Sequence, residues 1–495
     1  MSKAYQNYIA GEWCDSASGK RFENINPADH GDVVGSFPQG NVQDVDRAVA
    51  AAREAFDDWR LMPALTRGEI MKRVGDILLA RKEELARLQT REMGKVLAET
   101  RGDVQEGIDT AYFAFGQASR LTGQTIPSEL PNKFNMTTRI PLGVVGIITP
   151  WNFPMAIPTW KLFPALTSGN TVVFKPASDT PATATLLVEV LLEAGIPPLA
   201  INLVHGPGAV TGRAIVDHPH IDAISFTGSS AVGKVINATA GGELKRVSLE
   251  LGGKNAAIIM DDADLDLALE GVLWGAFGTT GQRCTATSRV IVHEQVYDDF
   301  LERLIETAKQ LRLGSGLDDG VDLGPVINDA ARDRIHQYVQ TGSQEGGKLI
   351  LGGRFASGDG LDQGSFYEPT IFTNVLPGMT IHDEEIFGPV LAVMKATSFT
   401  EAIELLNATD YGLSSSIYTN DVQAAFRAMR DIHTGITYVN GPTIGAEAHM
   451  PFGGVKNTGN GHREGGAAAY EFFSEVKTLY VDYSGTLQRA QIDNR

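Results

Sequence analysis

The chain has 495 residues, of which 43% are hydrophobic, 21% charged and 8% aromatic. This composition excludes disordered, collagen-like and coiled-coil proteins, and the length predicts a globular protein of about three compact units. With 42 Lys and Arg against 60 Asp and Glu, the net charge of −18 opposes binding to nucleic acid or to an anionic membrane surface.

Only two cysteines occur, Cys14 and Cys284, which are too few for a disulfide framework, so we expect a reducing compartment. The N-terminal segment has no apolar or Arg-rich targeting pattern, and the apolar run at 142–148 is far shorter than the about 20 residues of a membrane-spanning helix. The sequence therefore predicts a cytoplasmic protein without a membrane anchor. His218 and His220 flank a proline without acidic or thiol companions, so we expect no metal site.

Up to about residue 124, the pattern is a short strand hairpin followed by amphipathic helices at 42–60 and 67–94. From residue 143, short apolar runs alternate with helical patterns. The helix at 180–195 is well delimited, with Thr180 as N-cap, Pro181 in the first turn and Gly195 past its end. Repeated strand–helix–strand units predict a parallel sheet in an α/β fold. The predicted strands lie within 143–151, 171–178, 200–206 and 220–228.

A second α/β region begins near Gly253 and ends near residue 470. Its first elements are predicted as a strand, a helix, a strand and a helix. The tail at 477–483 is an apolar and aromatic strand with no local partner after it, so we expect it to pair with another subunit. The four elements at the start of this region lie at 256–260, 263–277, 289–294 and 297–312.

Three residues are candidates for catalysis, although each also has a purely structural interpretation. Cys284 lies in the small-residue loop GQRC, and a free thiol with a pKa near 8.5 needs an activating base. Glu250 lies in SLELGGKN beside glycines, 34 positions before Cys284, where a carboxylate can reach into a cleft and act as general base. Asn152 follows a predicted parallel strand, where α/β sheets bind ligands, and its amide is suited to an oxyanion hole.

Two glycine-rich stretches are candidates for dinucleotide binding. The glycines of GPGAVTG at 206–212 are spaced one position wider than the G-x-G-x-x-G fingerprint, which makes this signal weak. FTGSSAVG at 226–233 follows a predicted strand and opens a helix whose N-terminal amides can bind a pyrophosphate. Lys175 ends another predicted strand and can donate hydrogen bonds to a ribose or a phosphate.

The chain resembles the aldehyde dehydrogenase superfamily in seven motifs that occur in the same order over almost its whole length: PWNFP, FKPAS, FTGSSAVG, LELGGKN, GQRC, EEIFGPV and PFGGVKNTGNG. The resemblance implies that Cys284 is the nucleophile, Glu250 the general base, and Asn152 part of the oxyanion hole together with the backbone amide of Cys284. Lys161 matches a family lysine near the active site.

The same resemblance implies a set of cofactor contacts in which Lys175 binds the adenosine ribose and Ser229 the pyrophosphate. Glu385 and Phe387 would bind the nicotinamide ribose and ring. The full cofactor set is Thr149, Trp151, Lys175, Ser178, Gly208, Gly212, Phe226, Gly228, Ser229, Leu251, Glu385 and Phe387. The substrate set is Phe153, Trp160, Arg283, Thr285 and Phe452.

For the fold, the resemblance implies a Rossmann-like cofactor domain, an α/β catalytic domain and a small bridging element that joins subunits into dimers or tetramers. We assign 1–122 and 142–252 to the cofactor domain, 253–470 to the catalytic domain, and 123–141 with 471–495 to the bridging and oligomerisation element. The implied reaction is NAD(P)+-dependent oxidation of an aldehyde to a carboxylic acid through a cysteine thiohemiacetal and a thioester.

Cofactor preference depends on Ser178, because family members often carry a glutamate there that repels a 2′-phosphate. A serine leaves room for that phosphate and Lys175 supplies positive charge, so we expect NADP to be accepted, with NAD as a possible alternative. Asp179 would restore NAD preference if its carboxylate faced the ribose.

For the substrate, Arg283 either binds a distal carboxylate or pairs with a protein acid such as Glu106. The stretch 443–466 is similar to alpha-ketoglutaric semialdehyde (2,5-dioxovalerate) dehydrogenases, which favours a semialdehyde; an aliphatic or aromatic aldehyde is the alternative. Two other classes remain open, a cysteine esterase that leaves the cofactor motifs unused and a non-catalytic oligomeric scaffold. A CoA-acylating relative is disfavoured by the presence of Glu250, which favours water as the acyl acceptor.

Overall fold

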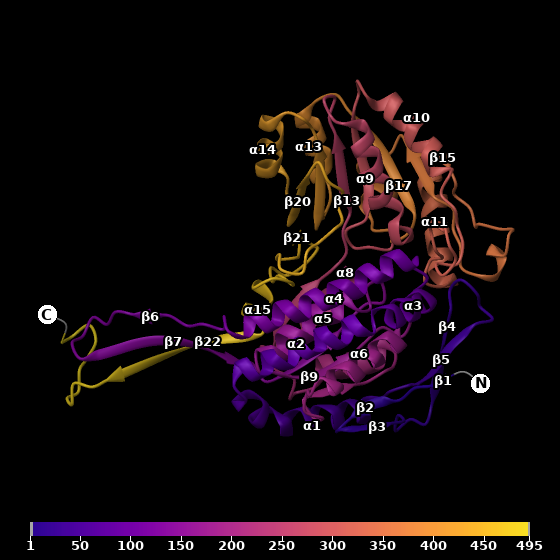
Figure 1. Ribbon diagram of the computed structural model, residues 1–495. Coiled ribbons are helices and arrows are strands. Elements are labelled where there is room, and N and C mark those ends of the chain that lie inside the picture. Colours follow the sequence, from indigo (N-terminus) through magenta and orange to yellow (C-terminus); the bar gives the residue numbers. More distant parts are fainter. Residues whose placement is uncertain (1–2, 494–495) are drawn as a thin grey trace.

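The computed structural model describes residues 3–493 and shows two α/β lobes and a projecting arm (Figure 1). Apart from β6 and β7, the elements up to β12 form the lower lobe, coloured indigo to magenta, and those from β13 to β21 form the upper lobe, coloured rose through orange to gold. The arm combines a purple segment from the first half of the chain with the yellow C-terminal strand. Within the described residues, no helix is long and apolar enough to cross a membrane.

The first lobe is built on a seven-stranded sheet of order β12-β11-β8-β9-β10-β2-β3. The strands from β8 to β12 are all parallel, as the sequence predicts, and β2 joins β10 antiparallel. Nearly all residues of the parallel strands are buried because helices cover both faces of the sheet. The bounds are β2 Asn7–Ile9, β3 Glu12–Cys14, β8 Val144–Ile148, β9 Thr171–Lys175, β10 Ile201–Leu203, β11 Ala223–Thr227 and β12 Arg246–Glu250.

The helices predicted for this lobe are present with two differences, and the helices at 97–118, 156–167 and 213–217 were not predicted. The segment predicted as one helix over 67–94 is divided at Arg81 into two helices. The helix predicted at 180–195 runs over Pro181–Glu193, but Thr180 makes no side-chain cap; instead the carboxylate of Glu92 accepts hydrogen bonds from the amides of Ala182 and Thr183. The bounds are α1 Val42–Leu61, α2 Ala64–Ala80, α3 Lys82–Met93, α4 Leu97–Ala118, α5 Ala156–Thr167, α6 Pro181–Glu193, α7 Arg213–Asp217 and α8 Ser230–Gly242.

The second lobe contains another seven-stranded sheet, of order β15-β16-β17-β14-β13-β19-β20, in which only β15 is antiparallel to its neighbour. Its strands are β13 Asn255–Ile259, β14 Thr287–His293, β15 Lys348–Leu351, β16 Thr370–Thr373, β17 Val390–Ala396, β19 Ser414–Tyr418 and β20 Ile436–Val439. Its helices are α9 Leu265–Phe277, α10 Tyr297–Ala308, α11 Asp329–Gln344, α12 Thr380–Asp383, α13 Phe399–Asn407 and α14 Val422–Asp431. The last helix, α15 Ala468–Phe472, packs into the core of the first lobe.

The arm is a three-stranded antiparallel sheet of β6 Thr125–Ile126, β7 Lys133–Pro141 and β22 Ser474–Asp482. The C-terminal tail is therefore a strand, as predicted, but its partner in the structure is β7 of the same chain, with Ser474 opposite Pro141 and Asp482 opposite Lys133. The residue pattern alone could not reveal this pairing because the two strands are more than 300 residues apart, although the resemblance grouped 123–141 with 471–495. The order β22-β7-β6 leaves one edge of β22 without a neighbouring strand within the described part of the chain.

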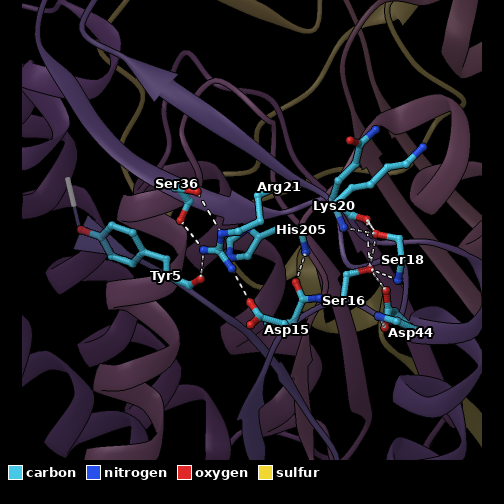
Figure 2. A network of polar contacts seen from close by, with 12 residues as sticks. Tyr5, Asp15, Ser16, Ser18, Lys20, Arg21, Ser36, Asp44 and His205 are labelled. Atoms are coloured by element: carbon cyan, nitrogen blue, oxygen red, sulfur yellow. Dashed lines mark hydrogen bonds and ion pairs between the residues drawn. The ribbon is translucent and has the colours of Figure 1, made fainter. Parts of the chain in front are cut away.

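A polar network around Arg21 joins the N-terminal strands β1 Lys3–Ala4, β4 Arg21–Ile25 and β5 Val33–Pro38 to one another (Figure 2). The guanidinium of Arg21 donates to the carbonyls of Tyr5 and Ser36, at 2.5 and 2.7 Å. Figure 2 shows His205 beside this guanidinium. The amide of His205 donates to Asn7 Oδ1 at 2.9 Å, so the turn that follows β10 is anchored to the N-terminal strands.

Candidate functional site

A cavity of about 370 Å³ lies where the strands β8, β11 and β12 reach their carboxyl ends. Ligands bind at this edge in open α/β sheets. The wall also includes the loop before β14, the segment 385–387 and two residues of α11, Arg334 and Tyr338, for which no sequence motif gave a signal. Eight of the predicted site residues line it together: Trp151, Asn152, Gly228, Ser229, Leu251, Cys284, Glu385 and Phe387.

Cys284 is held in a tightly turned loop between α9 and β14. Thr279 and Thr280 have φ values of 53° and 55°, and a Cβ at Gly281 would lie 2.2 Å from the carbonyl oxygen of Gly388, so only glycine fits there. The side chain of Asn152 donates to the carbonyl of Gln282 at 3.1 Å. The amide group of Asn152 is therefore fixed beside the loop that carries the thiol.

Burial raises the pKa of the Cys284 thiol, and the nearby carboxylates of Glu385 and Glu250 raise it further. A thiol in this environment is protonated at neutral pH, so it needs a base or a cation at the moment of attack.

Glu250 ends β12 and is 2% exposed. Neither of its carboxylate oxygens has a hydrogen-bond partner among the described residues, and a Cβ on Gly453 would lie 2.5 Å from Oε1. Burial and the charge of Glu464 raise the pKa of Glu250 well above its usual range, while Lys161 and Arg463 lower it. A carboxylate with a raised pKa and free oxygens is suited to accept a proton from water.

The second carboxylate, Glu464, was not identified from the sequence. It is 5% exposed, and the fully buried ammonium of Lys161 contacts its Oε1 and donates to Ser225 Oγ at 3.0 Å. Lys161 is thus bonded to Glu464, which leaves the oxygens of Glu250 unengaged. No spacing in the sequence could show this, since Lys161 and Glu464 are 303 positions apart.

The cavity wall suits a dinucleotide. Ser229 caps the 13-residue helix α8, whose N-terminal amides face the edge of the sheet and can bind a pyrophosphate. Trp151 and Phe387 meet edge to face with ring centroids 5.4 Å apart, which provides apolar contacts for a planar ring. Glu385 accepts a hydrogen bond from the amide of Gly253 at 3.1 Å, and its carboxylate can accept further bonds from ribose hydroxyls.

Several predicted cofactor residues lie outside this cavity wall. Phe226 packs beneath Gly228, where a Cβ would lie 2.6 Å from the Phe226 ring. Gly208 and Gly212 are the two ends of a short π-helix. Thr149 is 4% exposed, and its hydroxyl has no partner among the residues that the structure describes.

Lys175 ends β9 and Ser178 follows it, so both residues lie along the same edge of the sheet but outside the cavity wall. The amide of Thr149 donates to the carbonyl of Lys175 at 3.2 Å, which places β9 directly beside the end of β8. Burial lowers the pKa of Lys175 to about 8. The carboxylate of Asp179 accepts a hydrogen bond from Asn328 at 3.0 Å, and Ser178 donates to the carbonyl of Gly206 at 3.2 Å.

Of the predicted substrate residues, Trp160 and Phe452 lie beside the thiol, whereas Phe153 lies beside Arg283. Trp160 and Phe452 pack together with ring centroids 4.9 Å apart, and Cys284 packs against the cluster they form. The ring of Phe153 is covered by the ammonium of Lys95 at 3.4 Å and lies 5.4 Å from the guanidinium of Arg283.

Arg283 is engaged by protein groups. It donates to Glu99 Oε1 at 2.7 Å and to Thr279 Oγ1 at 2.9 Å, and the side chains of Arg283 and Glu99 are only 10% and 13% exposed. Of the two expectations for Arg283, the structure shows pairing with a protein acid, and the acid is Glu99 rather than Glu106. The carbonyl of Thr285 accepts from Thr443, which fixes the loop on the other side of the nucleophile.

The Aldehyde dehydrogenase family model matches residues 13–479. The chain is 43% identical over 477 residues to an alpha-ketoglutaric semialdehyde dehydrogenase of Bacillus subtilis, covering 96% of this chain and 98% of that protein. It is 43% identical over 481 residues to a 2,5-dioxopentanoate dehydrogenase of Saccharolobus solfataricus, covering 97% and 99%. The structure of Staphylococcus aureus betaine aldehyde dehydrogenase in complex with NAD+ is similar with a TM-score of 0.95 at 35% identity, covering 98% and 95%. The chain therefore belongs to the aldehyde dehydrogenase family, whose members are NAD(P)-dependent oxidoreductases.

Proposed function

We propose that this enzyme oxidises a semialdehyde to a carboxylic acid through a covalent intermediate on Cys284. The observation that carries the proposal is that one cavity collects the thiol of Cys284, the amide of Asn152 and the predicted nicotinamide contacts Glu385 and Phe387. A cysteine esterase would need only the thiol of Cys284 and the amide of Asn152. The cofactor-side residues have a role only if a dinucleotide binds next to the thiol.

In the first step, the thiol of Cys284 passes its proton to a water molecule, which carries it to solvent, and the sulfur forms a bond to the aldehyde carbon, so the carbonyl oxygen becomes an oxyanion. Asn152 is suited to stabilise this oxyanion. One N–H of its amide is bonded to Gln282, and the amide carries a second N–H that remains available. One such donor contributes about 2.7–4 kcal/mol to the transition state.

Collapse of the oxyanion expels a hydride, and the nicotinamide ring accepts hydride when the dinucleotide is bound. The acyl group then remains on Cys284 as a thioester. Glu250 takes a proton from a water molecule, which attacks the thioester carbon and releases the acid and the thiolate. The raised pKa of Glu250 makes it a stronger base than an exposed glutamate, and its two free oxygens leave room for the water.

The substrate proposal is alpha-ketoglutaric semialdehyde, and an aliphatic or aromatic aldehyde is the alternative. The first is supported by the relatives at 43% identity that carry this specificity in their names. The second has support in the apolar pair of Trp160 and Phe452 beside the thiol. A panel of aldehydes assayed with NAD and NADP, followed by the absorbance of the reduced nucleotide, tests the proposal. The semialdehyde should give the highest kcat/KM, and a preference for uncharged aldehydes would favour the alternative.

Replacing Arg283 with alanine should lower stability and leave selectivity unchanged. The substitution removes the ion-pair partner of Glu99, which keeps only the hydrogen bonds from the amide of Thr279, and this loss costs about 1–3 kcal/mol. Because the guanidinium is bonded to Glu99, kcat/KM should change by the same factor for alpha-ketoglutaric semialdehyde and for pentanal. Urea unfolding and both assays measure these effects. Arg101→Ala, which breaks an exposed pair with Glu83, is the matched control; a loss confined to the charged substrate would show that Arg283 binds it.

We further propose that NADP is accepted, since Ser178 carries no charge and Asp179 is bonded to Asn328. Ser178→Glu should lower kcat/KM for NADP about tenfold or more relative to NAD, because the new carboxylate repels the 2′-phosphate. Ser178→Ala keeps the space without adding charge and should have little effect on this ratio. Initial rates with both nucleotides measure it, and strict NAD use by the unaltered enzyme would contradict the proposal.

We also propose the three-part domain division at 1–122 with 142–252, 253–470, and 123–141 with 471–495, in a cytoplasmic homo-oligomer, either a dimer or a tetramer. The location of the two large sheets on either side of residue 252 supports the division. The free edge of β22 and the exposed side chains of Val476 and Tyr480 support assembly through the arm.

A further inference from the structure

The short segment 252–255 contacts both sides of the proposed site. The amide of Gly253 donates to Glu385 Oε1 at 3.1 Å. At Gly252 a Cβ would lie 2.0 Å from Glu385 Oε2, so the carboxylate rests directly on the backbone there. The segment begins two positions after Glu250 and leads into β13. It is therefore placed to couple the base, the thiol and the residues 384–387, which we call the nicotinamide strap.

Lys254 holds the nicotinamide strap from within the protein. It is 2% exposed, and its ammonium donates to the carbonyl of Glu384 at 2.7 Å. Within residues 3–493, no carboxylate lies within ion-pair distance of this ammonium. Burial, followed by the charge of Arg289, lowers the pKa of Lys254 to about 7. A buried ammonium without an ion pair is costly to the fold, so the contact that it makes calls for a functional reason.

Arg289 fixes both the backbone of Lys254 and the short helix α12, which precedes the nicotinamide strap. Its side chain is 1% exposed and donates twice to the carbonyl of Lys254, at 3.2 and 2.8 Å, and to two carbonyls near the end of α13. It also contacts His382 Nε2 at 3.2 Å. Since arginine only donates, His382 accepts at Nε2 and donates from Nδ1 to Asp383 at 2.5 Å. Burial lowers the pKa of His382 to about 4, so this arrangement does not titrate near neutral pH.

Asn255, the next residue, holds the loop of the nucleophile instead. Its side-chain amide donates to the carbonyls of Cys284 and Ala286, at 2.7 and 2.9 Å, and its oxygen accepts from the amide of Ser414 at 2.9 Å. Asn255 is 3% exposed, so these contacts are not exchanged for water. The side chain of Asn255 therefore fixes the carbonyls of Cys284 and Ala286, on either side of Thr285.

We propose that Lys254 and Asn255 are positioning residues, each of which holds a different segment of the site in place. Lys254 sets the nicotinamide strap and so serves dinucleotide binding and the hydride step. Asn255 sets the loop of Cys284 and so serves the attack on the substrate. The proposal rests on the roles given above to Cys284 and Glu385. Because the two side chains contact different segments, their removal has separable effects.

The test compares Lys254→Met and Asn255→Ala in the full-length enzyme by four measurements. These are aldehyde oxidation, dinucleotide affinity from tryptophan fluorescence, hydrolysis of p-nitrophenyl acetate without nucleotide, and the rate at which iodoacetamide alkylates Cys284. Lys254→Met loses a charge-assisted hydrogen bond to the nicotinamide strap, so its affinity for the dinucleotide should fall about tenfold or more. Its rates of ester hydrolysis and of alkylation should stay within about twofold of those of the original enzyme. Asn255→Ala should slow ester hydrolysis and alkylation about fivefold or more and leave dinucleotide affinity within about twofold.

Lys245→Met and Asn202→Ala are matched controls, because both side chains bond backbone groups at sites remote from the cavity. Lys254→Gln retains an N–H donor, so it should recover part of the dinucleotide affinity, and it replaces the methionine variant if that variant does not fold. Equal loss of all four activities in both variants, or unchanged affinity in Lys254→Met, would overturn the proposal. Failure of the unaltered enzyme to oxidise any aldehyde would instead overturn the proposed function, and the affinity and alkylation measurements would still decide this one.

Discussion

Replacing Cys284 with alanine is expected to lower the rate of aldehyde oxidation by about 10⁴-fold or more. The reason is that, in the proposed mechanism, the sulfur forms the bond to the substrate carbon, and no other cysteine is present near the cavity to replace it. Dinucleotide binding should be nearly unchanged, because the predicted contacts of the nucleotide are made by other residues. Steady-state rates and fluorescence titration with NAD and NADP measure the two effects.

Cys14 provides the matched control for this substitution. It lies in β3 at the edge of the first sheet and is the only other cysteine of the chain. Cys14→Ser should therefore leave the rate within about twofold of the original enzyme. A Cys284→Ala variant that still oxidises aldehydes at a tenth of the original rate would require a different nucleophile or direct hydride transfer from the aldehyde hydrate.

Replacing Glu250 with glutamine is expected to separate the two halves of the reaction. The hydride step does not need this carboxylate, so about one equivalent of reduced nucleotide per active site should still form rapidly. Hydrolysis of the thioester does need it, and steady-state turnover should fall about 10²–10⁴-fold. Stopped-flow absorbance of the reduced nucleotide records both the burst and the slow phase. Loss of the burst together with the turnover would assign Glu250 to activation of the thiol instead.

The acid limb of the pH profile should report the same residue. A protonated carboxyl cannot accept a proton, so turnover falls as the pH is lowered through the pKa of the base. Because burial and Glu464 raise the pKa of Glu250, this limb should lie above the pH expected for an exposed glutamate. In Glu250→Gln the residual turnover should lack that limb.

Much of the fold could be predicted because its signals are local. Each parallel strand of the first sheet is a short apolar run, and α6 is delimited by Pro181 and Gly195. The motif FTGSSAVG at 226–233 also has the expected structure, because it contains the end of β11, a turn and the start of a helix capped by Ser229. These features depend on residues within one turn or one strand, so the sequence contains the needed information.

The features that could not be predicted depend on contacts between distant parts of the chain. The cap of α6 comes from Glu92 on another helix, and the partner of β22 is a strand more than 300 positions earlier. The same is true in the site, where Glu464 meets Lys161 and Glu99 meets Arg283. The sequence gives no signal for Glu464 or Glu99, and only the packed structure shows that these carboxylates are buried with Lys161 and Arg283.

The most direct test of the account is the mass of Glu250→Gln after it is mixed with an aldehyde and dinucleotide. We expect each active subunit to gain the mass of the acyl group, on the peptide that contains Cys284, with one equivalent of reduced nucleotide formed. The adduct should be absent when the nucleotide is omitted, since a thioester arises from an aldehyde only by oxidation. Formation of reduced nucleotide with no acyl group on Cys284 would contradict the central claim that the reaction passes through this sulfur.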